Sequence, residues 1–317
     1  MKLISTLRIF VAILFLISPI DILCEKIPKY TLQNQKLRKL EVNANYIRVE
    51  YGKETTYDAN EFKNQFRQSI DYIRYKGNIV DLKKKFKIEA NTIIEIYFYE
   101  PITSLNKFFY AYIDPDLHLY GDPKAANIKL VDLSHFDSSL VRNARSMFDG
   151  CSSLEEINFD NFDTSKVTNM DYMFKDCSSI KSLDLSNFDT SQVTSMGYMF
   201  QFCSNLKSLD VSNFDTSKVT NMGYMFHRCT NLKSLDLSNF DTSQVHSMFE
   251  MFRRCSSLEF LDISNFNINR AIEIPGFDEI NPLKYLNIYN AQIDRIKDKI
   301  KGIIQNSTIV CQKDDFE

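Results

Sequence analysis

Five cysteines recur at one position of a repeated segment, and thiols can bind metals, form disulfides or act as nucleophiles. They stand 26 residues apart: Cys151, Cys177, Cys203, Cys229 and Cys255. We place them in a column among stacked helices, whose backbones lie about 8–10 Å apart, whereas a disulfide requires Cα atoms within about 7 Å. The column is therefore predicted to hold buried, free thiols. The alternative, a column of metal-binding or redox thiols, lacks a supporting Cys-x-x-Cys pair.

An acidic position recurs with the same spacing and is followed two residues later by serine. The aspartates are Asp184, Asp210, Asp236 and Asp262, and the serines are Ser186, Ser212 and Ser238. Like charges about 5 Å apart repel by roughly 1 kcal/mol in water, so a basic partner laid along the column would be favoured. Water, salt and the neighbouring lysines, Lys181, Lys207 and Lys233, are the simpler means of offsetting this repulsion. A divalent cation fits less well, because it prefers a cage of about six or more oxygens, and no metal site is predicted.

A second acidic column opens the turn that follows a repeated phenylalanine. It consists of Asp163, Asp189, Asp215 and Asp241. Short polar side chains in turns hydrogen-bond to nearby backbone amides. We therefore assign this column to backbone hydrogen bonds and not to a binding site.

Three tyrosines also share one repeat position: Tyr172, Tyr198 and Tyr224. We expect them to point outward on the convex, helical side, where exposed tyrosines suit contact with a protein or a sugar. The simpler interpretation is that they pack between adjacent helices.

Motifs of catalysis are missing from the sequence. It contains no Gly-x-Ser-x-Gly, no phosphate-binding loop and no Gly-x-Gly-x-x-Gly, and its four histidines have no ligand spacing. The abundant serines and aspartates recur as columns, which is typical of stacking. We predict that the chain is not an enzyme, has no catalytic residues and needs no cofactor.

The elements that position these columns are visible in one repeat, residues 180–205. Leu183-Asp184-Leu185 alternates with the period of a half-buried strand. Next comes a turn, and the apolar residues Val193, Met196, Met199, Phe200 and Cys203 then follow with the spacing of one face of a short helix. Each repeat is thus predicted to be strand, turn, short helix, turn, with successive strands pairing in parallel about 4.8 Å apart. A period in this range is typical of stacked repeats.

The segment Leu206-Lys-Ser-Leu209-Asp-Val211-Ser-Asn-Phe214 resembles a leucine-rich repeat, with Phe where that family usually has Asn. The second half, Met225-Phe226-His-Arg-Cys229-Thr-Asn-Leu232, resembles more specifically the BspA-like repeats of bacterial and protist surface proteins, over about residues 130–266. The resemblance implies an α/β solenoid: a right-handed leucine-rich-repeat-like stack with a parallel sheet on the concave face and short helices on the convex face. It also implies an extracellular adhesin-like protein without catalytic residues.

Five segments are expected along the chain. Residues 1–24 have the basic start and short apolar run of a signal peptide. Residues 25–91 form an N-terminal cap or lead-in segment. Residues 92–130 hold degenerate repeats, because Ile94-Glu-Ile96 matches Leu183-Asp-Leu185 and 102–109 aligns with 193–200. Regular repeats occupy 131–266, and 267–317 form a C-terminal cap with a helical stripe at 293–303 and a last strand at 308–311. Asn306 is a candidate glycosylation site.

The net charge of the repeat region limits which ligands it can bind. Residues 128–317 contain 19 Lys+Arg and 26 Asp+Glu, a net of −7 (19 − 26), which argues against nucleic acid as a ligand. No later segment is long and apolar enough to cross a membrane once the signal peptide is removed. We therefore expect a secreted or cell-surface repeat protein that binds an extracellular or surface protein through its polar sheet. The alternatives are a glycan-binding surface module, for which the tyrosines are the candidates, and a structural spacer without a ligand.

Overall fold

The computed structural model divides the chain into two units, residues 1–44 and residues 45–317. It describes residues 45–57, 70–81, 84–98, 101–111, 113–114, 119–120, 123–273, 275–280, 283–289 and 308–312. The predicted signal peptide, the helical stripe at 293–303 and Asn306 lie outside these residues.

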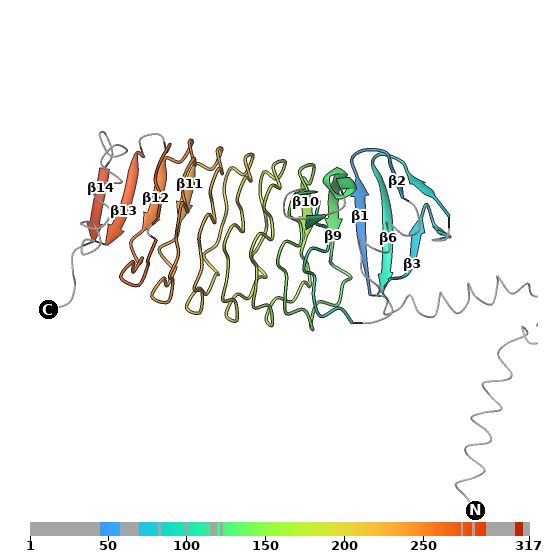
Figure 1. The fold of residues 1–317 in the computed structure, drawn as a ribbon, viewed down its shortest axis with the longest axis horizontal. Coiled ribbons are helices and arrows are strands. Elements are labelled where there is room, and N and C mark those ends of the chain that lie inside the picture. Colours follow the sequence, from blue (N-terminus) through green and yellow to red (C-terminus); the bar gives the residue numbers. More distant parts are fainter. Residues whose placement is uncertain are drawn as a thin grey trace, which may run out of the picture. The chain divides into compact units, whose positions relative to one another are not determined.

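The first described strands form a cap that continues into the repeats (Figure 1). The elements are β1 (Tyr46–Tyr51), β2 (Thr55–Tyr57), β3 (Ile70–Tyr75), β4 (Asn78–Ile79), β5 (Phe86–Ile88), β6 (Thr92–Phe98), β7 (Ile113–Asp114), β8 (Leu119–Tyr120), a 3-10 helix at Pro123–Asn127, β9 (Ile128–Asp132) and β10 (Glu156–Asn158). The main sheet has the order β10-β9-β1-β6-β3-β4, and β2–β5 and β7–β8 are two-stranded. Strand β1 pairs antiparallel with both β6 and β9, whereas β9 and β10 are parallel. One mixed sheet therefore joins the cap to the first repeats.

A second, parallel sheet lies at the other end of the repeats. Its strands are β11 (Ser234–Asp236), β12 (Phe260–Ile263), β13 (Tyr285–Tyr289) and β14 (Thr308–Gln312), in that order. Leu261 pairs with Leu286 and Ile263 with Ile288, so residues 25 positions apart in the sequence are neighbours on paired strands. The expected last strand at 308–311 is confirmed by β14.

Between the two sheets, successive repeats lie side by side, and equivalent positions are neighbours (Figure 1). One ladder of parallel bridges runs through Ser104, Asn143, Asn169, Ser195, Asn221, Ser247 and Glu273. Phenylalanine rings stack along the interior, with centroids of Phe174 and Phe200 5.6 Å apart and nearly parallel. Burial of these apolar side chains is the main stabilising contribution, because each fully buried one is worth about 1.5–3 kcal/mol.

The predicted fold class is wrong. No α-helix occurs in the described residues, and the strands form separate mixed and parallel sheets instead of one concave sheet backed by helices. Where short helices were expected, each repeat has a series of tight turns. Residues 180–185 and 206–211 were expected to be strands, but neither segment forms one. Single backbone hydrogen bonds join the two segments, such as the bond that Lys207 N donates to Lys181 O at 3.1 Å.

Backbone hydrogen bonds explain why the apolar stripe forms turns. In residues 196–203, alternate amides bond three residues back, as Met199 N does to Met196 O (3.3 Å) and Cys203 N to Phe200 O (3.1 Å). The intervening amides cross to the next repeat, as Tyr198 N does to Gly223 O at 2.8 Å. Tyr198 and Phe202 have φ of 62° and 63°, a left-handed conformation that ends any right-handed helix. The stripe is nevertheless buried, because the turns return every third or fourth side chain to the interior.

The degenerate upstream copy divides between cap and repeats. Ile94 and Ile96 lie in β6, which pairs antiparallel with β1 and β3, so this segment belongs to the cap sheet. Residues 102–109 instead continue the repeat ladder, since Ser104 bridges Asn143 in parallel and Phe109 N donates to Met147 O at 2.8 Å.

The five cysteines are free and buried, as predicted. The reason given for this was wrong, because no helices separate the repeats in the described part of the chain. Each thiol instead donates to a carbonyl oxygen of the preceding repeat, as Cys203 Sγ does to Phe174 O at 3.1 Å. Burial raises the pKa of all five thiols, and that of Cys255 to about 12.

Candidate interaction surface

We call the side of the repeats that carries strands β9 to β13 the sheet side. The aspartate column comprises equivalent repeat positions on this side: Asp132, Asn158, Asp184, Asp210, Asp236, Asp262 and Asn287. In each member up to Asp262, one side-chain oxygen accepts the amide two residues later, at 2.8–3.0 Å. This contact is an Asx turn, which redirects the chain after each strand segment. The predicted binding aspartates therefore also shape the backbone, which the sequence interpretation had assigned only to the second acidic column.

The predicted serines Ser186, Ser212 and Ser238 supply the amides for these turns. The Ser186 hydroxyl also donates to Asp184 Oδ1 at 2.7 Å. Hydrogen bonds from the Ser186 hydroxyl and amide lower the pKa of Asp184, and the Ser212 amide and hydroxyl do the same for Asp210. These carboxylates are therefore held in the charged form.

The two ends of the aspartate column are engaged by neighbouring side chains, an arginine at one end and an asparagine at the other. At the cap end, Arg48 Nη1 lies 3.6 Å from Asp132 Oδ2 and the next position is the uncharged Asn158. At the other end, Asn287 Nδ2 donates to Asp262 Oδ2 at 2.8 Å, so both oxygens of Asp262 are engaged. Within the described part of the column, exposed carboxylates with an unused oxygen are thus confined to the three middle positions.

These middle carboxylates, Asp184, Asp210 and Asp236, are exposed. No ion pair to any of them occurs among the residues that the structure describes, although Lys181, Lys207 and Lys233 stand three positions earlier in the same repeats. These lysines therefore do not neutralise the aspartates by direct contact. The structure brings together three acidic groups on adjacent repeats, each with one oxygen unused by its turn.

The second acidic column is confirmed as a set of backbone caps. Each aspartate accepts the amide two residues later, at 2.8–2.9 Å: Asp163, Asp189, Asp215 and Asp241. The equivalent position of the following repeat is Asn267, which accepts the Asn269 amide at 3.0 Å. An uncharged asparagine therefore performs the same structural role.

The tyrosine column is a stack and not a set of separate exposed rings. Tyr172 and Tyr198 have centroids 4.5 Å apart, and Tyr198 and Tyr224 4.6 Å, with nearly parallel planes. The Arg145 guanidinium lies 4.6 Å from the Tyr172 centroid, and Phe249 meets Tyr224 edge-on. Burial, with Tyr172 and Tyr224 beside it, raises the pKa of Tyr198 to about 12. The ring faces are mostly occupied, which leaves the edges for contact with a ligand.

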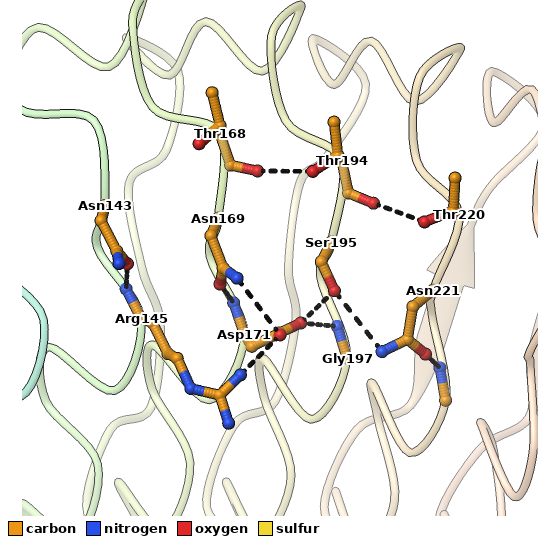
Figure 2. Close-up of polar contacts among 11 residues, drawn as sticks. Asn143, Arg145, Thr168, Asn169, Asp171, Thr194, Ser195, Gly197, Thr220 and Asn221 are labelled. Carbon is orange, nitrogen blue, oxygen red and sulfur yellow. Dashed lines mark hydrogen bonds and ion pairs between the residues drawn. The ribbon is translucent and has the colours of Figure 1, made fainter.

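A polar network that the sequence interpretation missed centres on Asp171 (Figure 2). Its Oδ1 accepts the Gly197 amide at 2.8 Å and the Ser195 hydroxyl at 2.5 Å. Arg145 Nη1 lies 2.8 Å from its other oxygen. In neighbouring repeats an asparagine caps its own repeat instead, as Asn221 Oδ1 does for the Gly223 amide at 3.0 Å.

The sequence carried a signal for this network. Asp171 stands where the following repeats have Gly197 and Gly223, and Ser195 stands where its neighbours have Asn169 and Asn221. In this pair of repeats the short Ser195 side chain leaves room for the Asp171 carboxylate, which accepts its hydroxyl. A Cβ added at Gly197 would lie 2.5 Å from Asn221 Nδ2, which shows how little space the usual pair leaves.

An exposed threonine ladder runs beside this network (Figure 2). The hydroxyls of Thr168, Thr194 and Thr220 each donate to the backbone carbonyl of the preceding repeat at 3.1 Å. These side chains reinforce the backbone ladder and carry no reactive group.

A second buried polar group, Asp149, lies in the turns of the first regular repeats. Asp149 is buried, with Oδ1 3.4 Å from Lys175 Nζ, and Lys175 also lies 2.6 Å from Asp176 Oδ2. Burial raises the pKa of Asp149 to about 6, although the Lys175 ammonium opposes the shift.

Within the described part of the chain, no group of three or more His, Cys, Asp or Glu side chains is placed to hold a metal ion. No helix in that part has the length and apolar character needed to cross a membrane.

Comparison with known families gives one match. Residues 122–209 and 178–277 are similar to the family described as "Mycoplasma protein of unknown function, DUF285". Together these segments span residues 122–277, just under half of the chain, and they coincide with the repeats. The description names no activity. No curated protein matches the chain.

Proposed function

We propose that the chain is a secreted or cell-surface protein that binds a basic segment of another protein along the aspartate column. The observation that carries the proposal is the run of Asp184, Asp210 and Asp236, three exposed carboxylates on adjacent repeats without ion pairs among the described residues. An extended segment is the fitting ligand, because equivalent positions on paired chains recur about every 4.8 Å and an extended chain can reach along three adjacent repeats. Complementary charge of this kind governs specificity and association rate.

The location rests on the signal-like residues 1–24 and on the resemblance to BspA-like surface repeats. The measurement is the N-terminus of the exported protein by mass spectrometry. Export with cleavage after Cys24 supports the proposal, and retention of the uncleaved chain inside the cell contradicts it.

The structure suggests a sharper test of binding than deletion of the acidic side chains. Asn158 forms the same Asx turn as the aspartates, with its Oδ1 2.8 Å from the Asp160 amide. Asp→Asn changes at 184, 210 and 236 therefore remove three charges and keep the caps. Affinity for basic partners selected from a panel of extracellular proteins should fall at least about threefold, since exposed ion pairs contribute roughly 0.2–1 kcal/mol each. Its salt dependence should fall as well.

A matched control removes three charges from the second acidic column. Asp189→Asn, Asp215→Asn and Asp241→Asn preserve their turns, as Asn267 does naturally. Both triple variants have the same net charge. If they lose the same affinity, binding depends on overall charge and the aspartate column is not the site.

The glycan-binding alternative has less support. Sugars stack on ring faces, whereas Tyr172, Tyr198 and Tyr224 cover one another's faces. This alternative predicts loss of binding to a glycan array after Tyr198→Ala or Tyr224→Ala. A structural spacer predicts no ligand in either screen.

A further inference from the structure

The sheet side changes character at its C-terminal end, where an aromatic pair interrupts a row of serines. Phe260 in β12 and Tyr285 in β13 are strand neighbours whose ring centroids are 4.6 Å apart and whose planes differ by 4°. The equivalent positions in earlier repeats are Ser182, Ser208 and Ser234. Both rings are half-buried.

Among the described residues, the two strand neighbours of Phe260 differ in size. Tyr285 occupies the face toward β13, while the strand neighbour on the other side is Ser234. A serine side chain is too short to cover an aromatic ring. The Phe260 face toward β11 is therefore available to a ligand that lies along the serine row.

The polar groups around this ring are acceptors. Asp236 stands two residues from Ser234 on the same strand, diagonal to Phe260, and only its Oδ1 is used, by the Ser238 amide at 3.0 Å. Asn287, 6% exposed, has an Oδ1 without a hydrogen-bond partner among the described residues. This acceptor is unused because β13 continues to Tyr289 instead of turning. The nearby Lys284 is paired with Glu259 at 2.6 Å.

We infer that the basic segment bound by the aspartate column carries an arginine whose guanidinium stacks on Phe260 and donates to Asp236. The inference rests on the proposed function and adds the identity of one ligand residue and its place. A guanidinium is planar and has five N–H donors, so it can stack on a ring and bond a carboxylate together. A lysine ammonium is a compact charge that cannot satisfy both contacts in the same way.

The test uses two synthetic extended peptides that are identical except that three arginines in one are lysines in the other. Both are titrated against the full mature chain, the Phe260→Leu variant and the triple Asp→Asn variant. The wild type should bind the arginine peptide roughly two- to fivefold more tightly than the lysine peptide. Phe260→Leu should abolish that preference and retain salt-dependent binding of both peptides. Phe249→Leu, which changes an exposed phenylalanine outside the sheet side, should keep the preference.

The outcomes separate the two proposals. Equal binding of both peptides to the wild type, or a preference that survives Phe260→Leu, overturns the arginine site but leaves the aspartate column in place if the triple variant binds weakly. Absence of salt-dependent binding of either peptide to the wild type overturns both. Thermal unfolding of each variant shows whether the Phe260→Leu substitution disturbs the fold.

Discussion

The amide of Gly197 donates to Oδ1 of Asp171, which belongs to the preceding repeat, at 2.8 Å. In the next repeat Asn221 caps Gly223 locally. One repeat thus depends on its neighbour for a buried hydrogen bond that other repeats supply themselves. The pair Asp171 and Ser195 stands where the next repeats have Gly197 facing Asn221.

This dependence predicts a rescue. Asp171→Gly should lower the free energy of unfolding by about 1–3 kcal/mol, because it leaves the buried Gly197 amide unsatisfied. Adding Ser195→Asn should recover most of the loss by recreating the arrangement of Gly197 and Asn221. Ser195→Asn alone should destabilise, because the longer side chain at position 195 would crowd Asp171. Urea unfolding of the four proteins measures the coupling, and additive effects would contradict the account.

The left-handed conformation of one residue in each series of turns predicts that a Gly variant there is more stable than an Ala variant, the reverse of the order in a helix. At Tyr198, with φ of 62°, the Gly variant should be more stable than the Ala variant by about 1 kcal/mol. In a helix the order would be reversed by about the same amount. Gln201, whose φ is not positive, is the control, and there Ala should be the more stable. Equal or reversed order at 198 in urea unfolding would restore the helical interpretation.

The thiol column predicts a loss of stability at alkaline pH. Burial raises the pKa of each thiol above its ordinary value of 9.0. The stabilisation is therefore fully present below about pH 9 and is lost as the pH rises toward the folded pKa, because unfolded thiols ionise first. Between pH 8 and pH 10, the free energy of unfolding of Cys255→Ala should fall by about 1.4 kcal/mol less than that of the wild type. Identical pH profiles would show that Cys255 ionises normally. Thiol reagents should label none of the five cysteines in the folded protein.

Asp149 predicts an effect of the same origin at acidic pH. Burial raises its pKa from 3.8 to about 6, so its contribution to stability is fully present below about pH 4 and is lost as the pH rises through 6. Relative to Asp149→Asn, the wild type should lose about 2 kcal/mol between pH 4 and pH 7. The difference between the two urea midpoints across this range isolates Asp149 from the other carboxylates. A constant difference would show that Lys175 holds the carboxylate ionised throughout.

The burial pattern could be predicted from the sequence, whereas the backbone that produces it could not. Met196, Met199 and Cys203 are buried as expected, since their spacing places them on one side in either a helix or a turn series. Turns with left-handed residues usually announce themselves by glycine, but here Tyr198 and Phe202 occupy those positions. Hydrogen bonds between repeats stabilise these conformations, and such bonds are absent from any single-repeat analysis.

The candidate site, like the backbone, could be predicted only in part from the sequence. Asp184-x-Ser186 and Asp189-x-Ser191 are the same motif and make the same turn, so assigning one to binding and the other to structure was not justified by the motif. The distinction comes from neighbours: Asn287 hydrogen-bonds the second oxygen of Asp262, and Arg48 forms an ion pair with Asp132. Those contacts depend on strand pairing across 25 or more residues. The Asp171 network could have been found from the paired departures at 171 and 195.

The reliance of Gly197 on Asp171 makes the repeats unequal as units of insertion and deletion. Removing residues 206–231 would set Gly197 beside Ser247, the partner that Gly223 already has. Removing residues 180–205 would instead set Asp171 against Asn221, whose Nδ2 lies 2.5 Å from where a Cβ at Gly197 would stand. Lineages that gain or lose 26-residue blocks should therefore tolerate breaks after Asn205 more readily than breaks that part Asp171 from Ser195.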